Sequence, residues 1–428
     1  MSRPWISAAG AAGAVIVAVG LVRAAERPAA SLAAARGHVY YVDQLSGDDA
    51  NAGTSPAQAW KTLRRAGSVT YGPGDRLLLR RGESWRDALR IHGAGTSARP
   101  IVIGAYGSGT QPLLQTASSC VTIDASHVAV TGLHVDRCGW AGVEIRGSDV
   151  RVRRMLVTRN VAGIVVRPGS TGARIARNVI RDNDRMSVLT RTPTDDDSGA
   201  FGVLLQGDRS VVTHNTIVGS DAFSYDYGRD GSAVEVDGGR NDTIDHNLAV
   251  DDNAFTELSQ RRSSGNSYFY NVVRSNLRRS TFLVTPGTQN RRGPVAATRA
   301  FNNTVYLTGS ESEGFVCYDG CTDSVLELRN NIIAAGRKAG YAAGPVDEDF
   351  DLIVHGATQF ALGPHALVAP AGFVSPTVGN FRLRRGSPAI DHGVSLGRRI
   401  DFAGDRVPVD GDGDGVARPD IGAFEYGR

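Results

Sequence analysis

Short apolar segments recur along the chain, and their residue alternation is typical of β-strands with one buried face. In residues 234–236 two valines flank Glu235, and Asp237 follows directly. Because side chains alternate across a strand, the valines share one face, and Glu235 and Asp237 share the other. The same phrase recurs at residues 121–123, 143–145, 164–166, 203–205, 234–236, 256–258, 282–284 and 316–318.

A second phrase recurs out of phase with the first and begins with an asparagine before a small apolar strand. A regularly spaced Asn suits an internal ladder, in which each side-chain amide bonds the coils before and after it. The asparagines concerned are Asn178, Asn215, Asn247, Asn271, Asn303 and Asn331.

Short strands that recur at the intervals of these two sets of segments predict a solenoid. The 3.6-residue periodicity of helical repeats is absent from these segments, and so is the leucine spacing of leucine-rich repeats. We therefore expect an all-β parallel β-helix with capping segments over its ends, because an open coil exposes sheet edges. The expected parts are an N-terminal cap and first coils (38–100, with a short helix over 60–66), a core with binding loops (101–345), and last coils with a C-terminal cap (346–428).

The N-terminus begins with a charged segment, continues in an apolar run to Val22 and then becomes rich in alanine. This order predicts a secretory signal peptide over about residues 1–30 and an extracellular protein. Permanent anchoring by the same run is the alternative, since its length approaches that of the shortest membrane-spanning helices. We expect no membrane contact after processing.

The net charge is +3, which gives no electrostatic footprint for nucleic acid. The four cysteines allow two local disulfides, Cys120 with Cys138 and Cys317 with Cys321, as suits an exported chain. Free buried thiols are the alternative. We expect a polysaccharide as the partner, and a monomeric protein.

Two insertions interrupt the repeat, at residues 181–200 and 218–232. Long loops on one side of a solenoid usually form its binding wall. They emerge beside the outward residues of the strands at 203, 234 and 256. Along these strands the outward face changes from basic to amide to acidic, which suits a polysaccharide groove with Arg146, Arg167, Gln206 and Arg261 as substrate-binding residues.

Glu235, Asp237 and Glu257 form the acidic part of this face, on neighbouring coils about 4.8 Å apart. Like charges at that distance repel unless something shares them. The three carboxylates therefore predict either a Ca²⁺ site or a shared proton. A solvated sheet face is the alternative that predicts no function.

The opening segment 41–63 and the ending segments 387–391 and 419–426 resemble those of secreted right-handed parallel β-helix proteins of the pectate-lyase-like superfamily. Residues 256–263 are locally similar to a stretch of alginate lyases and chondroitin B lyase. The resemblance implies that Glu257 binds Ca²⁺ and that Arg262 stands at the position of the catalytic lysine. The sequence departs from the pattern, because the base is an arginine and Phe255 replaces a second metal-binding glutamate.

Three functions follow from these features. The first is a lyase that cleaves an acidic polysaccharide by β-elimination, with Arg262 or Tyr225 or Tyr227 as the base. The second is a glycoside hydrolase that draws its acid and base from Asp230, Glu235, Asp237 and Glu257. The third is a non-catalytic carbohydrate-binding β-helix. The arginines favour an anionic substrate and hence the lyase.

Two further groups of residues carry candidate chemistry. Asp410, Asp412 and Asp414 resemble the start of a calcium loop, which predicts a structural Ca²⁺ far from the groove. His214 and His246 precede ladder asparagines in equivalent places, so we interpret them as residues repeated by the period.

Overall fold

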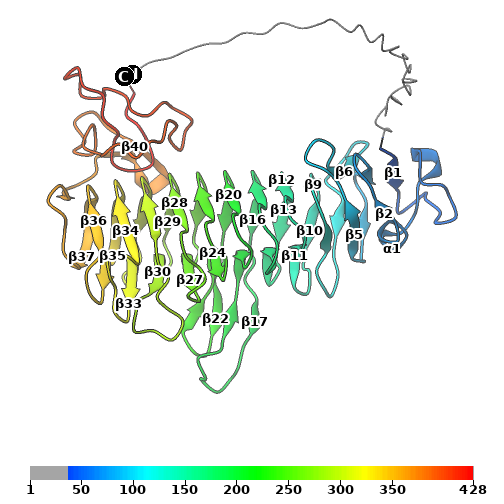
Figure 1. Ribbon diagram of the computed structural model, residues 1–428, viewed down its shortest axis with the longest axis horizontal. Helices are drawn as coiled ribbons and strands as arrows, with labels where there is room; N and C mark the ends of the chain where they lie inside the picture. The colour runs from blue at the N-terminus through cyan, green and yellow to red at the C-terminus, as the bar shows by residue number, and fades with distance from the viewer. Residues whose placement is uncertain (1–36, 428) are drawn as a thin grey trace, which may run out of the picture. The chain divides into compact units, whose positions relative to one another are not determined.

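The computed structural model describes residues 37–427, so the predicted signal peptide lies outside the described residues. Each coil contributes strands to three faces, and each strand pairs in parallel with its counterpart one coil away (Figure 1). This arrangement is the predicted parallel β-helix. The described residues include no helix long and apolar enough to cross a membrane.

The first face is a sheet made of β1 (Val39–Val42), β3 (Arg76–Arg80), β6 (Ile101–Tyr106), β9 (Val128–Thr131), β12 (Arg151–Arg153), β15 (Arg174–Ala176), β20 (Val211–Thr213), β25 (Thr243–Asp245), β28 (Ser267–Phe269), β31 (Thr298–Phe301), β34 (Leu326–Arg329) and β36 (Asp347–Asp349).

The second face, here called the groove face, is made of β2 (Thr70–Tyr71), β5 (Leu89–Ala94), β8 (Val121–Ser126), β11 (Ala141–Ile145), β14 (Ala162–Val166), β19 (Phe201–Leu205), β24 (Ser232–Asp237), β27 (Ala254–Ser259), β30 (Thr281–Pro286) and β33 (Glu313–Tyr318).

The third face is made of β4 (Ser84–Trp85), β7 (Leu113–Leu114), β10 (His134–Asp136), β13 (Leu156–Thr158), β16 (Val179–Arg181), β21 (Thr216–Val218), β26 (Leu248–Val250), β29 (Val272–Ser275), β32 (Thr304–Leu307) and β38 (Leu367–Val368). The long strands β35 (Ile332–Ala342) and β37 (Leu352–Gln359) pass from the third face to the groove face.

Both predicted insertions form hairpins beside the groove face. Residues 181–200 contain β17 (Met186–Val188) and β18 (Ser198–Gly199), and residues 218–232 contain β22 (Ala222–Ser224) and β23 (Gly228–Asp230). Both hairpins extend from the same edge of the coils (Figure 1).

The core consists of columns of in-register apolar side chains. On the groove face one column runs through Val143, Ile164, Val203 and Val234, all fully buried. Burial of each such side chain contributes roughly 1.5–3 kcal/mol. At the next coil the column continues with Thr256, whose hydroxyl donates to the Val234 carbonyl at 2.8 Å.

The predicted asparagine ladder is confirmed. The Asn178 side-chain amide donates to the Asn215 side-chain oxygen at 2.9 Å, and each following Asn repeats the bond as far as Asn331, which donates to Asp351 at 3.0 Å. The residue before each ladder Asn has a positive φ, for example 54° at His214. The buried amides stabilise these left-handed corners by satisfying the backbone there.

Both predicted disulfides are present, Cys120–Cys138 and Cys317–Cys321. The predicted N-terminal helix is α1 (Leu63–Gly67), which follows η1 (Pro56–Gln58). It begins after Thr62, whose hydroxyl accepts from the Arg65 amide at 3.1 Å, a standard N-cap.

The C-terminal segment contains the hairpin β39 (Phe373–Ser375) and β40 (Asn380–Leu383), with η2 (Pro376–Val378) between the two strands. Phe381 and Ile421 pack against outward residues of the third face, among them Ile332 and Leu352. The segment we expected to cover the end therefore packs against the side of the last coils.

Candidate active site

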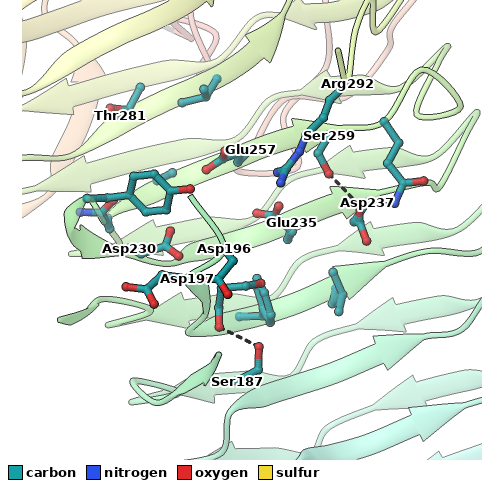
Figure 2. A pocket seen from close by; sticks show the side chains of 18 of the residues that line it. Ser187, Asp196, Asp197, Asp230, Glu235, Asp237, Glu257, Ser259, Thr281 and Arg292 are labelled. Atoms are coloured by element: carbon teal, nitrogen blue, oxygen red, sulfur yellow. Dashed lines mark hydrogen bonds between the residues drawn. The ribbon is translucent and has the colours of Figure 1, made fainter. Parts of the chain in front are cut away.

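A cavity of about 710 Å³ lies on the groove face, over β19, β24 and β27. The hairpin residues Asp197 and Asp230 and the loop residue Arg292 also line it (Figure 2). Its size suits a ligand of one or a few sugar rings. It lies where the sequence predicted the binding groove.

Hydrogen bonds fasten the two hairpins to each other. The Asp226 carboxylate accepts from the backbone amides of Thr194, Asp196 and Asp197, each at 2.8 Å. In return Asp197 accepts from the Ser224 hydroxyl at 2.8 Å. These hydrogen bonds order the wall, and they bring Asp196, Asp197 and Asp226 within 4.8 Å of one another.

Glu235 and Glu257 are directly opposite each other on β24 and β27. Leu204 occupies the same outward column one coil earlier, and Val284 one coil later. Neighbouring parallel strands are about 4.8 Å apart, so the two carboxyl groups face the cavity at close range. The predicted acidic column is thus a pair of glutamates between two apolar residues.

The surroundings of Glu235 favour its protonated form. Burial, the neighbouring Glu257 carboxylate and the nearby Asp230 and Asp237 together raise the pKa of Glu235 well above its ordinary value, while a bond from the Ser232 hydroxyl at 2.8 Å opposes them. These surroundings favour the protonated form of Glu235 over its carboxylate.

The surroundings of Glu257 differ in charge. Burial and Asp230 raise the pKa of Glu257, but Arg292 and Arg279 lower it. Neither carboxylate oxygen of Glu257 has a hydrogen-bond partner among residues 37–427. The arginines make Glu257 the partner that ionises first, and Figure 2 shows Arg292 reaching toward both glutamates.

Asp230 ends β23 and also lines the cavity. Burial raises the pKa of Asp230 to about 6, against a bond from the Gly231 amide that lowers it. Asp230 thus adds negative charge beside Glu235 above that pH. This strengthens the retention of the Glu235 proton.

The predicted Ca²⁺ site in the groove does not fit the geometry. Asp237 accepts from Gln206 at 3.0 Å, from the Ser259 hydroxyl at 2.7 Å and from Gln260 at 2.5 Å. Among the described residues, the groups of three carboxylates or histidines that approach within 4.8 Å do not include Glu235, Asp237 and Glu257. Asp237 is held by hydrogen-bond donors rather than aimed with the glutamates at one point.

The structure places Arg262, the base implied by the local resemblance, outside the cavity lining. Its guanidinium forms two bonds to Asp208, at 2.7 and 2.8 Å, and a further bond to the Gly238 carbonyl. Asp208 raises the pKa of Arg262 further. Because a bidentate ion pair holds this group and its proton, we assign it no catalytic step.

The predicted substrate-binding residues divide into two pairs. Arg167 and Gln206 line the cavity, and the Arg167 guanidinium donates to the Gln206 side-chain oxygen at 3.3 Å. Arg146 is held outside the lining by Glu144 at 3.0 Å, and Arg261 is an exposed residue that also lies outside it.

Tyr227 lines the cavity, but its hydroxyl donates to Asp195 at 2.6 Å. Burial and Asp195 raise the pKa of Tyr227, so the hydroxyl holds its proton. Tyr225 lies outside the lining. Neither tyrosine is placed as a ready base.

Among the cavity residues that the sequence prediction missed are Trp140, Phe201, Arg279 and Arg292. Trp140 directly precedes β11 and Phe201 begins β19, so both lie within three residues of a repeated segment and the strand register could have found them. The two arginines lie in connections after β29 and β30, and nothing in the repeat indicates where such connections fold.

Only two of the three aspartates of the predicted C-terminal calcium loop lie together in a carboxylate cluster. Asp410 and Asp412 form a cluster with Asp391, whereas Asp414 pairs with Arg418 at 3.2 Å. One Asp391 oxygen already accepts from the amides of Gly411 and Asp412, both at 2.8 Å. The cluster offers carboxylate ligands of the kind that Ca²⁺ binds.

No protein-family model matches the chain. It is similar to lacto-N-biosidase of Bifidobacterium longum subsp. longum (43% identical over 79 residues, 18% of this chain and 5% of that protein). It is also similar to α-1,3-galactosidase A of Akkermansia muciniphila (35% over 66 residues, 15% of this chain and 11% of that protein). The matches thus span a small part of either relative's length.

Among solved structures, pectate lyase Pel9A superposes with a TM-score of 0.58 at 14% identity, over 92% of this chain and 97% of that one. The complex of XylC with xylose gives 0.51 at 10% identity, over 74% and 75%. At such low identity the likeness shows the fold. It confirms the parallel β-helix.

Proposed function

We propose that the protein is a secreted carbohydrate-active enzyme, and specifically a retaining glycoside hydrolase with Glu235 as general acid and Glu257 as nucleophile. The observation that carries the proposal is the unequal pair on β24 and β27. Burial and three carboxylates, Glu257, Asp230 and Asp237, raise the pKa of Glu235. Burial and Asp230 also raise the pKa of Glu257, but Arg292 and Arg279 lower it. Environments that push two carboxyl pKa values apart assign the acid and its anionic partner.

The spacing supports retention. Carboxyl groups of retaining glycosidases lie about 5–5.5 Å apart, and those of inverting enzymes about 6.5–9.5 Å. Neighbouring parallel strands are about 4.8 Å apart, so side chains in register on them leave the backbone at about that separation. Glu235 and Glu257 occupy such positions.

The reaction proceeds in two steps. Glu235 gives its proton to the glycosidic oxygen as the bond from that oxygen to the anomeric carbon breaks, and the Glu257 carboxylate bonds to that carbon. Glu235, now ionised, then takes a proton from water. The resulting hydroxide bonds to the anomeric carbon and releases Glu257, which restores both groups.

The two short sequence matches support hydrolysis, since both named relatives are glycosidases. Elimination on an acidic sugar is the second candidate, because Arg279 and Arg292 would suit an anionic group. The bases predicted for elimination are not placed for it, since Arg262 is held by Asp208 and the Tyr227 proton is held by Asp195. A non-catalytic role leaves the unequal pair without a purpose.

The test is product chemistry on a panel of neutral and acidic glycans and aryl glycosides. We expect new reducing ends without ultraviolet absorbance from unsaturated sugars, and proton NMR should show the substrate's own anomer first. Absorbance that rises with cleavage would establish elimination instead, and the opposite anomer would refute retention. Glu235→Gln should abolish cleavage. Glu313→Gln is the matched control, because Glu313 lies outside the cavity and pairs with Arg337.

A further inference from the structure

The outer side of the groove face carries an apolar patch directly beside the catalytic pair. On β11, β14 and β19 the outward side chains form one cluster, separate from the core of the solenoid, which we call the apolar floor: Ala141, Ala162, Val165, Phe201, Leu204 and, at its edge, Trp140. In the column of Val165 and Leu204, the outward residue on β11 is Glu144, with Thr122 one coil before it. Glu235 follows Leu204 one coil later.

This patch belongs to the cavity. Phe201 and Leu204 are 7% and 5% exposed, and both line the cavity together with half-buried Trp140. Apolar side chains on the outward face of a strand contribute nothing to the inner core. In the column that becomes Glu235, Val165 and Leu204 are apolar on two successive coils, after Glu144 on β11. Val165 is fully buried, whereas Leu204, Phe201 and Trp140 line the cavity and give a ligand an apolar surface there.

We infer that the apolar floor is a sugar subsite that receives an apolar surface of the residue next to the scissile bond. That surface is either the C–H face of the ring or the methyl of an N-acetyl or 6-deoxy substituent. This inference rests on the proposed function, because it takes Glu235 and Glu257 as the point of cleavage.

The positions of the floor residues support this occupant. Leu204 and Glu235 are directly opposite each other on neighbouring strands, so a sugar lying over Leu204 brings its linkage to the acid. Trp140 gives an aromatic surface against which a C–H face packs. Arg167, Gln206 and Ser187 around the floor can bond the hydroxyls of the same sugar. Because the floor consists of strands, it holds the ring in one place.

Binding can be measured without turnover. Trp60 and Trp85 are buried at 1% and 4% exposure, so Trp140 is the tryptophan of the described part that a ligand can reach. We would titrate the full chain with glucose, N-acetylglucosamine and fucose and follow tryptophan fluorescence, with Trp140→Phe as the control. Saturable change in the wild type that is absent in Trp140→Phe is expected. Equal response to all three identifies the ring face, and preference for one methylated sugar identifies the methyl group.

Steady-state kinetics gives a second test of the subsite. Leu204→Thr places on the floor the residue that β8 carries in the same column, so the strand accepts it. We expect its KM for the best aryl glycoside to rise about 5- to 10-fold with a smaller change in kcat, as fits the loss of roughly 1 kcal/mol of apolar contact. Val316→Thr, in the same column on β33 and outside the cavity, should change neither.

The two proposals fail separately. Fluorescence changes without hydrolysis would leave the subsite in place and refute the hydrolase. Hydrolysis with unchanged KM in Leu204→Thr and no fluorescence response to any of the three sugars would refute the subsite and leave the hydrolase. A KM change equal in Leu204→Thr and Val316→Thr would show a general effect on the sheet and would also refute the subsite.

Discussion

Two groups of buried carboxyls in this protein share a raised pKa and differ in everything else. In the cavity, burial raises the pKa of both Glu235 and Glu257. In the C-terminal segment, burial raises the pKa of Asp420 to about 7 and that of Glu425 to about 8. The shift alone therefore does not distinguish a reactive site from a structural one.

The difference lies in hydrogen bonds. Glu425 accepts from the amides of Asp420 at 2.9 Å and Val409 at 3.2 Å, and Asp420 accepts from Asp391 at 2.8 Å and Tyr426 at 2.6 Å. Glu257 accepts from no group in the described chain. Carboxyls whose oxygens are all used by the backbone hold a fold together, whereas a raised pKa with free oxygens leaves capacity for a substrate.

The largest expected effect is on turnover in Glu257→Gln. Losing the nucleophile should lower kcat by at least about 10³-fold, at the upper part of the range for groups that act in the transition state. Stability should stay equal or increase, because a buried ionisable group becomes neutral. Steady-state kinetics and urea unfolding of the same preparation check both. A stable variant with near-normal turnover would end the distinction between the two groups.

The converse variant is Glu425→Ala. It leaves two backbone amides without an acceptor, each at about 1–3 kcal/mol if buried, so unfolding of the C-terminal segment should become easier by that order. Turnover per folded molecule at low temperature should not change. Urea unfolding alongside kinetics measures this, and unchanged stability would show that these carboxyls are dispensable.

Stability should fall as the pH rises from about 4 to about 8. The ordinary pKa values of Asp420 and Glu425 are 3.8 and 4.5, and the folded values are about 7 and about 8. The folded state thus binds more protons than the unfolded state across this window, and the free energy of unfolding decreases with pH. The urea midpoint should follow this slope, and Glu425→Gln should flatten it. A rising midpoint would contradict the assignment.

Arg292→Gln should move the acidic limb of the pH–activity profile upward by a few tenths of a unit to about one unit. Arg292 lowers the pKa of Glu257, so its loss makes the nucleophile harder to ionise. The basic limb, which reports the Glu235 proton, should move less. Arg229→Gln is the control, since Arg229 also lines the cavity but pairs with Asp221. Equal shifts in both variants would remove the asymmetry of the pair.

The smallest expected effect concerns calcium at Asp391, Asp410 and Asp412. If the ion binds there, Ca²⁺ at ten times its Kd stabilises the fold by about 1.4 kcal/mol. Removal by a chelator should leave turnover unchanged, because Glu235, Asp237 and Glu257 do not form one of the carboxylate groups of the described residues that lie within 4.8 Å of one another. Thermal unfolding with Ca²⁺ and with Mg²⁺ tests the first statement. Chelator-sensitive turnover would contradict the second.

Much of this arrangement could be predicted from the sequence because a solenoid repeats. The Asn178–Asn331 ladder and the opposition of Glu235 and Glu257 follow from period and alternation alone. Arg262 could not be placed, since its position depends on Asp208, fifty-four residues earlier in the chain. Arg279 and Arg292 were missed because the repeat does not determine their positions either. They lie in connections outside the repeat, and those connections decide which glutamate keeps the proton.

The in-register stacking of the groove face has a consequence for stereochemistry. Separations along the axis come in whole coils, so two carboxyls in one column lie about 4.8 Å apart or about twice that. The first value is close to the separation used for retention, and the second is near the upper end of that used for inversion. Insertion or deletion of a single coil between two acids would therefore change the anomeric outcome in one step, with no side chain altered.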